Sequence, residues 1–215
     1  MTDENIEVLK IVIIGESSVG KTSIIAQFVD KIFQEELQST VGGTFNSKSI
    51  KCEDKNKILK LEIWDTAGQE RYRSVTRMFY KDADVAILVY DITNKNSYEE
   101  LKNYWVEQVQ ESSQKDIMLV IVANKSDLLE NEKVEEEEAR NYAKSINALY
   151  FLASAKQSES INGLFMAIAK KYTGANKVSI VEENEESICD VQKIRKTSVR
   201  VTQEKIKKKK KRCKN

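Results

Sequence analysis

The chain has 215 residues and a formal net charge of +1, with 40% hydrophobic and 32% charged residues, enough for one domain with a real core. It contains no histidine, which excludes imidazole general-base catalysis and histidine-ligated metal sites. Its three cysteines, Cys52, Cys189 and Cys213, have neither zinc-site spacing nor a redox CxxC pair, and no apolar run approaches the length of a membrane span. The acidic start MTDENIEVLK lacks the build of a secretory signal, so we expect a cytosolic protein.

Charge is distributed unevenly along the chain. Residues 193–215 carry twelve Lys or Arg and one acid, a charge of +11, which leaves −10 for residues 1–192. Such a split indicates a folded domain followed by a tail with a separate role. We therefore expect an N-terminal extension over residues 1–7, a domain over 8–173 and a disordered tail over 174–215 with a polybasic end.

Short apolar runs alternate along the chain with segments of helical period. Phe45–Cys52 is polar and precedes the alternating run Leu59–Trp64, which predicts a hairpin. Helical patterns cover Ile24–Val29, a segment that begins near Glu135–Glu138, and Ile161–Tyr172. This order predicts an α/β fold with a six-stranded, mostly parallel sheet and helices on both faces. The five apolar runs are Val8–Ile14, Leu59–Trp64, Val85–Tyr90, Ile117–Ala123 and Leu149–Ala153.

The segment GESSVGKT, residues 15–22, matches the phosphate-binding pattern GxxxxGK[ST] between a strand and a helix. Its small residues allow successive backbone N–H groups to surround phosphates. Lys21 would supply charge to the outer phosphates, and the Thr22 hydroxyl would bind Mg²⁺. Taken alone, this loop does not distinguish ATP from GTP. The predicted contacts here are Gly15, Ser17, Ser18, Val19, Gly20, Lys21, Thr22 and Ser23.

Two further motifs indicate the base. NKSD, residues 124–127, ends a predicted strand, and the Asp127 carboxylate can accept hydrogen bonds from N1–H and the 2-amino group of guanine. Adenine lacks both donors, so it would leave the carboxylate unpaired. Lys125 can lay its aliphatic stem along the base, and in SAK, residues 154–156, the Ala155 N–H can donate to the 6-oxo group. The predicted base contacts are Asn124, Lys125, Asp127, Ser154, Ala155 and Lys156.

WDTAGQE, residues 64–70, supplies the residues expected around the terminal phosphate. Asp65 can reach Mg²⁺ through a water, the Gly68 N–H can meet a γ-phosphate, and Gln69 can orient the attacking water as the catalytic residue. Thr40 lies in a long polar connection between the two phosphate motifs, where its hydroxyl can complete the Mg²⁺ shell. The predicted metal ligands are thus Thr22, Thr40 and Asp65.

Together these motifs resemble the G domain of the Ras superfamily, over residues 8–173. Four blocks resemble Rab proteins in particular: VGGTF (41–45), KLEIW (60–64), RYRSVT (71–76) and LVYDIT (88–93). FYKDA (79–83) is a looser match to the Rab-typical YYRGA.

The resemblance implies a GTP-hydrolysing switch in vesicle or endosomal traffic, slow without an activating protein. It implies that Phe33 stacks on guanine, that residues 34–45 and 66–78 move, and that Phe45, Trp64 and Tyr80 form the cluster that effectors contact. Plain core packing is the alternative for Phe45 and Trp64. The implied partners are GTP and GDP, effectors, exchange factors, GTPase-activating proteins and a prenyl-binding carrier, with no nucleic acid and a monomeric chain.

The end of the chain, KKKKKRCKN, departs from the usual Rab ending. Cys213 is followed by only two polar residues, which is no CaaX box, so prenylation at Cys213 stays open. The basic run is also typical of a nuclear localisation signal or a nucleic-acid-binding patch, but the flanking Cys213 and the G domain favour a membrane role. Two alternatives therefore remain: a P-loop ATPase or nucleoside kinase, against which NKSD and SAK argue, and a GTPase that acts in the nucleus.

Overall fold

The computed structural model describes residues 5–35, 40, 43–66, 79–80, 82–112 and 116–181. A single sheet runs through them in the order β6-β5-β4-β1-β3-β2-β7. β1 pairs in parallel with β3 and β4, and the parallel pairing continues through β5 to β6. The strands are β1 (Asn5–Ile14), β2 (Gly43–Cys52), β3 (Lys57–Thr66), β4 (Val85–Asp91), β5 (Met118–Asn124), β6 (Leu149–Leu152) and β7 (Val178–Ile180).

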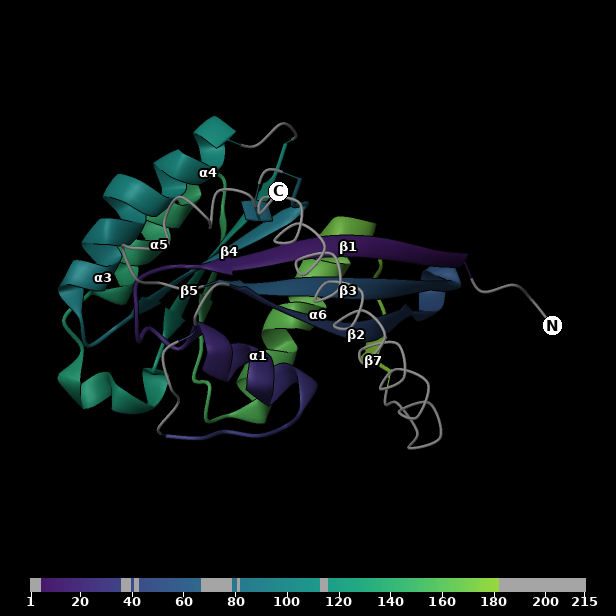
Figure 1. Ribbon diagram of the computed structural model, residues 1–215, viewed down its shortest axis with the longest axis horizontal. Coiled ribbons are helices and arrows are strands. Elements are labelled where there is room, and N and C mark those ends of the chain that lie inside the picture. Colours follow the sequence, from purple (N-terminus) through teal and green to yellow (C-terminus); the bar gives the residue numbers. More distant parts are fainter. Residues whose placement is uncertain are drawn as a thin grey trace, which may run out of the picture. The chain divides into compact units, whose positions relative to one another are not determined.

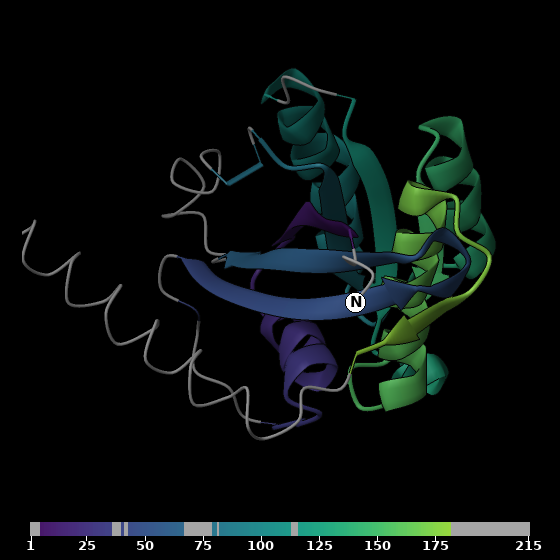
Figure 2. The ribbon, with the colours of Figure 1, turned by 90° about the vertical axis from the view of Figure 1, so that its right-hand side faces the viewer.

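The predicted hairpin is confirmed. β2 and β3 pair antiparallel across the 3₁₀ turn η1 (Glu53–Lys55), and Figure 2 shows the two strands as a long curved ribbon. All five apolar runs lie largely in strands. Outside β3, whose Leu59, Leu61 and Ile63 face one core, the side chains of these runs alternate between two cores. Leu9, Ile11 and Ile13 of β1 face one core, while Val12 and Ile14 face the other. Burial on both faces explains why these strands have near-continuous apolar sequences.

The sheet has seven strands rather than the expected six. β7 pairs antiparallel with β2 from Ile50 to Cys52. Asp54 of η1 supports it, because its carboxylate accepts the backbone N–H groups of Asn176 (2.8 Å) and Lys177 (3.4 Å). Three residues are too few to show a period of two, so the strand has no signature in the sequence. It lies beyond residue 173, where the domain was expected to end.

Helices cover both faces of the sheet, as expected. α1 (Lys21–Val29) and α6 (Ser158–Thr173) pack on the face that holds Leu9, Ile11 and Ile13, where Phe28 stacks on Phe165 at 3.8 Å between ring centroids. The opposite face carries α3, α4 and α5, which lie together in Figure 1. These elements are α3 (Lys95–Glu100), the π-helical turn η3 (Leu101–Trp105), α4 (Val106–Ser112) and α5 (Glu136–Ser145), and a 3₁₀ turn η4 (Ser126–Asn131) follows β5.

The helical stretch from α3 to α4 was not among the helices predicted from sequence. Its signal is present: Tyr98, Leu101, Trp105 and Val109 recur at helical spacing and are all buried. Asn94 caps its start, since the side chain accepts the Asn96 N–H at 3.1 Å.

Register places the carboxyl ends of the parallel strands at one edge of the sheet. Ile13 of β1 lies opposite Asp65 of β3, and Asp91 of β4 lies opposite Asn124 of β5. The loop after β1 and the polar residues that end β3, β4 and β5 therefore meet there.

The chain divides into two units, Met1–Ile180 and Val181–Asn215. Apart from Val181, the second unit lies outside the described residues, so the disordered tail stays a prediction. Among the residues described, no helix combines the length and the apolar character needed to cross a membrane.

Candidate functional site

A pocket of about 420 Å³ opens at the carboxyl ends of the parallel strands. Five parts of the chain line it: the loop after β1 with the start of α1, the segment after α1, the end of β3, the polar loop after β5, and the loop after β6. Most of the predicted contacts lie in its wall, and Gln34, Glu35, Thr66 and Leu128 line it as well without having been predicted. The predicted residues in the wall are Ser17, Ser18, Gly20, Lys21, Thr22, Ser23, Phe33, Thr40, Asn124, Lys125, Asp127, Ala155 and Lys156.

Lys21, the first residue of α1, is 6% exposed and folds back over the loop after β1. Its Nζ donates to the backbone oxygens of Gly15 (2.9 Å) and Glu16 (2.6 Å). Burial lowers the pKa of Lys21 to about 8, although the nearby carboxylates of Asp65 and Glu16 act in the opposite direction. A buried ammonium at the start of a helix forms a site that favours an anion.

Two glycines of this loop have no room for a side chain. A Cβ on Gly15 (φ +142°) would lie 2.3 Å from the backbone oxygen of Val89. A Cβ on Gly20 (φ +98°) would lie 2.2 Å from the Nδ2 atom of Asn124. Both also have backbone conformations that other residues rarely adopt, so the loop geometry requires glycine at these positions.

Thr22, Thr40 and Asp65 converge beside Lys21, as predicted for the metal ligands. The Thr22 hydroxyl donates to Asp65 Oδ2 at 2.7 Å and lies 2.8 Å from the Thr40 hydroxyl. Burial raises the pKa of Asp65, against the hydrogen bond from Thr22 and the charge of Lys21. Within the described part of the chain, Asp65 Oδ1 is buried and has no hydrogen-bond partner. Two hydroxyls and a carboxylate with a spare oxygen are the oxygen donors that Mg²⁺ prefers, so these residues fit that ion.

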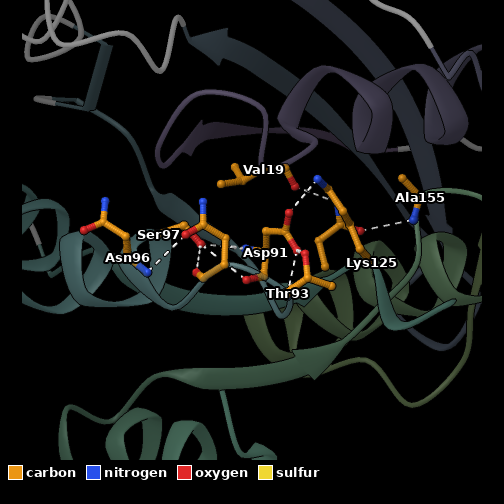
Figure 3. Close-up of polar contacts among 9 residues, drawn as sticks. Val19, Asp91, Thr93, Asn96, Ser97, Lys125 and Ala155 are labelled. Carbon is orange, nitrogen blue, oxygen red and sulfur yellow. Dashed lines mark hydrogen bonds and ion pairs between the residues drawn. The ribbon is translucent and has the colours of Figure 1, made fainter. Parts of the chain in front are cut away.

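Asn124 forms hydrogen bonds that connect two walls of the pocket. Its Nδ2 donates to the backbone oxygen of Val19 at 2.7 Å, and its Oδ1 accepts the Ala155 N–H at 3.1 Å (Figure 3). Asn124 is 1% exposed, so these bonds are shielded from water. The Ala155 N–H expected to meet guanine is thus already engaged, and its contact with a base stays a prediction.

Asp127 lies at the pocket wall with its carboxylate held in place. Ser154 donates to its Oδ1 at 2.5 Å, and Lys156 Nζ lies 3.4 Å from its Oδ2. Burial acts to raise the pKa of Asp127, but the hydrogen bond from Ser154 and the charge of Lys156 outweigh it and lower the pKa. Lys156 also stands over the Phe33 ring, 5.6 Å from its centroid, and 3.5 Å from Glu35. An ionised acceptor and an aromatic face therefore meet at this end of the pocket.

Comparison with known proteins agrees with this geometry. A model of the Ras family matches residues 10–174, which is more than half of the chain. The chain belongs to the Ras family of small GTPases. It is 44% identical over 162 residues to the Ras-related protein RabJ of Dictyostelium discoideum, a match that covers 75% of this chain and 62% of RabJ. It is 42% identical over 171 residues to the GTP-binding protein ypt5 of Schizosaccharomyces pombe, covering 79% of this chain and 80% of ypt5.

The aromatic cluster of this small GTPase also contains Phe79, which was not predicted. Trp64 contacts Phe45 at 5.2 Å and Phe79 at 5.3 Å between ring centroids, and Phe45 is 43% exposed. Tyr80, the residue expected in this cluster, is 1% exposed and belongs to the core beneath α3 and α4. Trp64 and Phe79 pack against this same core, so the cluster is continuous with it.

Two acidic residues that support the GTPase pocket were missed. Asp91, at the end of β4, forms an ion pair with Lys125 at 2.6 Å. Glu16, in the loop after β1, accepts the indole N–H of the buried Trp105 at 3.1 Å, which connects that loop to η3. Their positions in the sequence could have identified both residues, because Asp91 ends an apolar strand and Glu16 lies inside the phosphate motif.

Some predicted residues lie elsewhere. Gly15, Val19, Asp65 and Ser154 do not line the pocket but form hydrogen bonds with residues that do, namely Lys21, Asn124, Thr22 and Asp127. Gly68, Gln69 and Cys213 lie outside the described residues, so their roles stay predictions.

Proposed function

We propose that this GTPase is a Rab-type molecular switch, which binds Mg²⁺–GTP in the pocket and recruits effectors to a vesicle or endosomal membrane in its GTP form. One observation carries the proposal: the residues of the phosphate loop, the Thr22–Thr40–Asp65 group and the NKSD and SAK loops meet around a single pocket. The names of the relatives, RabJ and GTP-binding protein ypt5, support it.

In this proposal, different residues of the pocket bind different parts of the nucleotide. Backbone N–H groups of the loop after β1 and the Lys21 ammonium bind the phosphates. Asp127 reads N1–H and the 2-amino group of guanine, while Phe33 and the stem of Lys125 cover the faces of the base. Thr22 and Thr40 hold Mg²⁺, with Asp65 reaching it through water. The bound ion neutralises charge on the β- and γ-phosphates.

Gln69 carries the catalytic role, as the residue that orients the attacking water. Gln69→Leu should leave GTP binding unchanged and slow single-turnover hydrolysis by about tenfold or more, because leucine cannot hydrogen-bond water. Gln110→Leu, on the exposed side of α4, is the matched control and should hydrolyse GTP at the unchanged rate. Equal rates for the wild type and Gln69→Leu would remove Gln69 from the mechanism.

The tail serves as a two-part membrane anchor in this proposal. Residues 205–214 contain eight Lys or Arg, and each contributes about 1 kcal/mol near an anionic leaflet. A single lipid chain binds only marginally, whereas a chain with a polybasic patch binds stably. A prenyl-binding carrier would then shuttle the monomeric protein through the cytosol between membranes, and exchange factors and GTPase-activating proteins would set its nucleotide state.

Cys213→Ser should release the protein from membranes in its own cells, while leaving salt-sensitive binding to anionic liposomes. Cell fractionation measures the first effect and liposome sedimentation with and without salt measures the second. Cys189→Ser is the control and should stay on membranes. Mass spectrometry that finds Cys213 unmodified in the membrane fraction would contradict the lipid anchor, and wholly nuclear protein would contradict membrane attachment altogether.

A further inference from the structure

Asp91 is a buried carboxylate just behind the pocket wall. It ends β4, is 7% exposed, and lies opposite Asn124 in the register of β4 and β5. Its Oδ2 is 2.6 Å from Nζ of Lys125, the residue after Asn124. Asp91 is not among the residues that line the pocket, whereas Lys125 is. The carboxylate of Asp91 therefore reaches the pocket wall through Lys125.

The other oxygen of Asp91 is held by its own chain. Asp91 Oδ1 accepts the backbone N–H of Thr93 at 2.8 Å and the Thr93 hydroxyl at 2.7 Å (Figure 3). The backbone of Asp91 is held as well, because its N–H donates to the Ser97 hydroxyl at 3.0 Å and Ser97 in turn donates to Asn94. These bonds orient the carboxylate so that Oδ2 faces Lys125.

The side chain of Lys125 takes a single position only if another group restricts its rotamers. It has a left-handed backbone (φ 69°), and its side chain is 32% exposed, so four rotatable bonds lie near solvent. A lysine side chain that becomes ordered loses the rotamer entropy of its long stem. The ion pair with a carboxylate that is itself held in place restricts the Lys125 side chain before any ligand arrives.

We propose that Asp91 is a positioning residue for nucleotide retention, which holds the stem of Lys125 against the purine ring and so slows nucleotide release. This inference rests on the proposed function, in which the stem of Lys125 covers one face of the base. The amide that Asp91→Asn introduces is a poor substitute for the carboxylate. Thr93 presents a fixed backbone N–H, so the amide oxygen must face it, and the amide NH₂ then faces the Lys125 ammonium.

Release of GDP labelled on the ribose, chased with excess unlabelled GDP and Mg²⁺, tests the proposal. Asp91→Asn should accelerate release by about tenfold, the lower end of what loss of a charged hydrogen bond gives. Thr93→Val, which removes only the hydroxyl that orients Asp91, should accelerate it by a smaller factor. Asp54→Asn is the matched control, because the Asp54 carboxylate likewise accepts two hydrogen bonds, from the N–H groups of Asn176 and Lys177, but lies on η1. This variant should release GDP at the wild-type rate.

The same measurement in a Lys125→Met background separates positioning from a general structural effect. Asp91→Asn should add no further acceleration there, because the side chain on which it acts is gone. Additional acceleration in that background would overturn the proposal, as would a release rate for Asp91→Asn within twofold of the wild type. If Asp91→Asn does not fold, Thr93→Val replaces it in the wild-type and Lys125→Met backgrounds, and the same two outcomes support or overturn the proposal. Unchanged release in Lys125→Met alone would instead contradict the proposed contact between Lys125 and the base.

Discussion

Asp127→Asn should reverse the base preference of this small GTPase from guanine to xanthine. Guanine offers two donors, N1–H and the 2-amino group, to an ionised carboxylate, whereas asparagine presents an amide donor toward the same place. Xanthine has a 2-oxo group there, which accepts that donor. Sites built around a hydrogen bond reject the mismatched ligand by a factor on the order of 10⁴. Competition of GDP and XDP for the purified variant measures the change.

The surroundings of Asp127 favour such a reversal over simple loss of binding. The Ser154 hydroxyl, 2.5 Å from Oδ1, can donate equally to the amide oxygen of asparagine, so the side chain keeps its orientation. The lowered pKa of Asp127 means that the wild-type carboxylate is ionised at neutral pH, with acceptors only. Asp127→Ala is the control and should lose affinity for both nucleotides. A strong preference of Asp127→Asn for GDP would show that Asp127 does not read the base.

Lys21→Met should lower the affinity for GDP and GTP by about a thousandfold. Methionine keeps the apolar stem but removes the charge, and loss of one partner of a buried charged pair typically costs about 2–5 kcal/mol. The backbone oxygens of Gly15 and Glu16 would also lose the donor that now orders the loop. Equilibrium titration with fluorescent GDP measures the loss.

Lys48→Met provides a matched comparison for Lys21→Met. Lys48 is likewise buried, and its Nζ also donates to two backbone oxygens, those of Phe28 (2.7 Å) and Val29 (3.2 Å) at the end of α1. It does not line the pocket. Its replacement should therefore lower the free energy of unfolding while nucleotide affinity changes by less than about tenfold. Similar losses of affinity in both variants would mean that Lys21 acts through stability alone.

The sequence by itself determined most of the sheet and most of the pocket wall. Strands such as β1 and β4 are buried on both faces, so their apolar runs are visible locally. GESSVGKT, NKSD and SAK each follow such a run, and parallel topology brings strand ends to one edge. Lys21, Asp65 and Asp127 could therefore be assigned to one site before their distances were known.

Tertiary structure alone decided the features that depend on contacts between distant segments. β7 forms because three residues pair with the open edge of β2, and Phe79 joins Trp64 and Phe45 because the fold brings these three side chains together. The Asp91–Lys125 pair likewise depends on the register of β4 against β5. A motif records residues that are close along the chain, whereas these contacts join residues that only the folded sheet brings together.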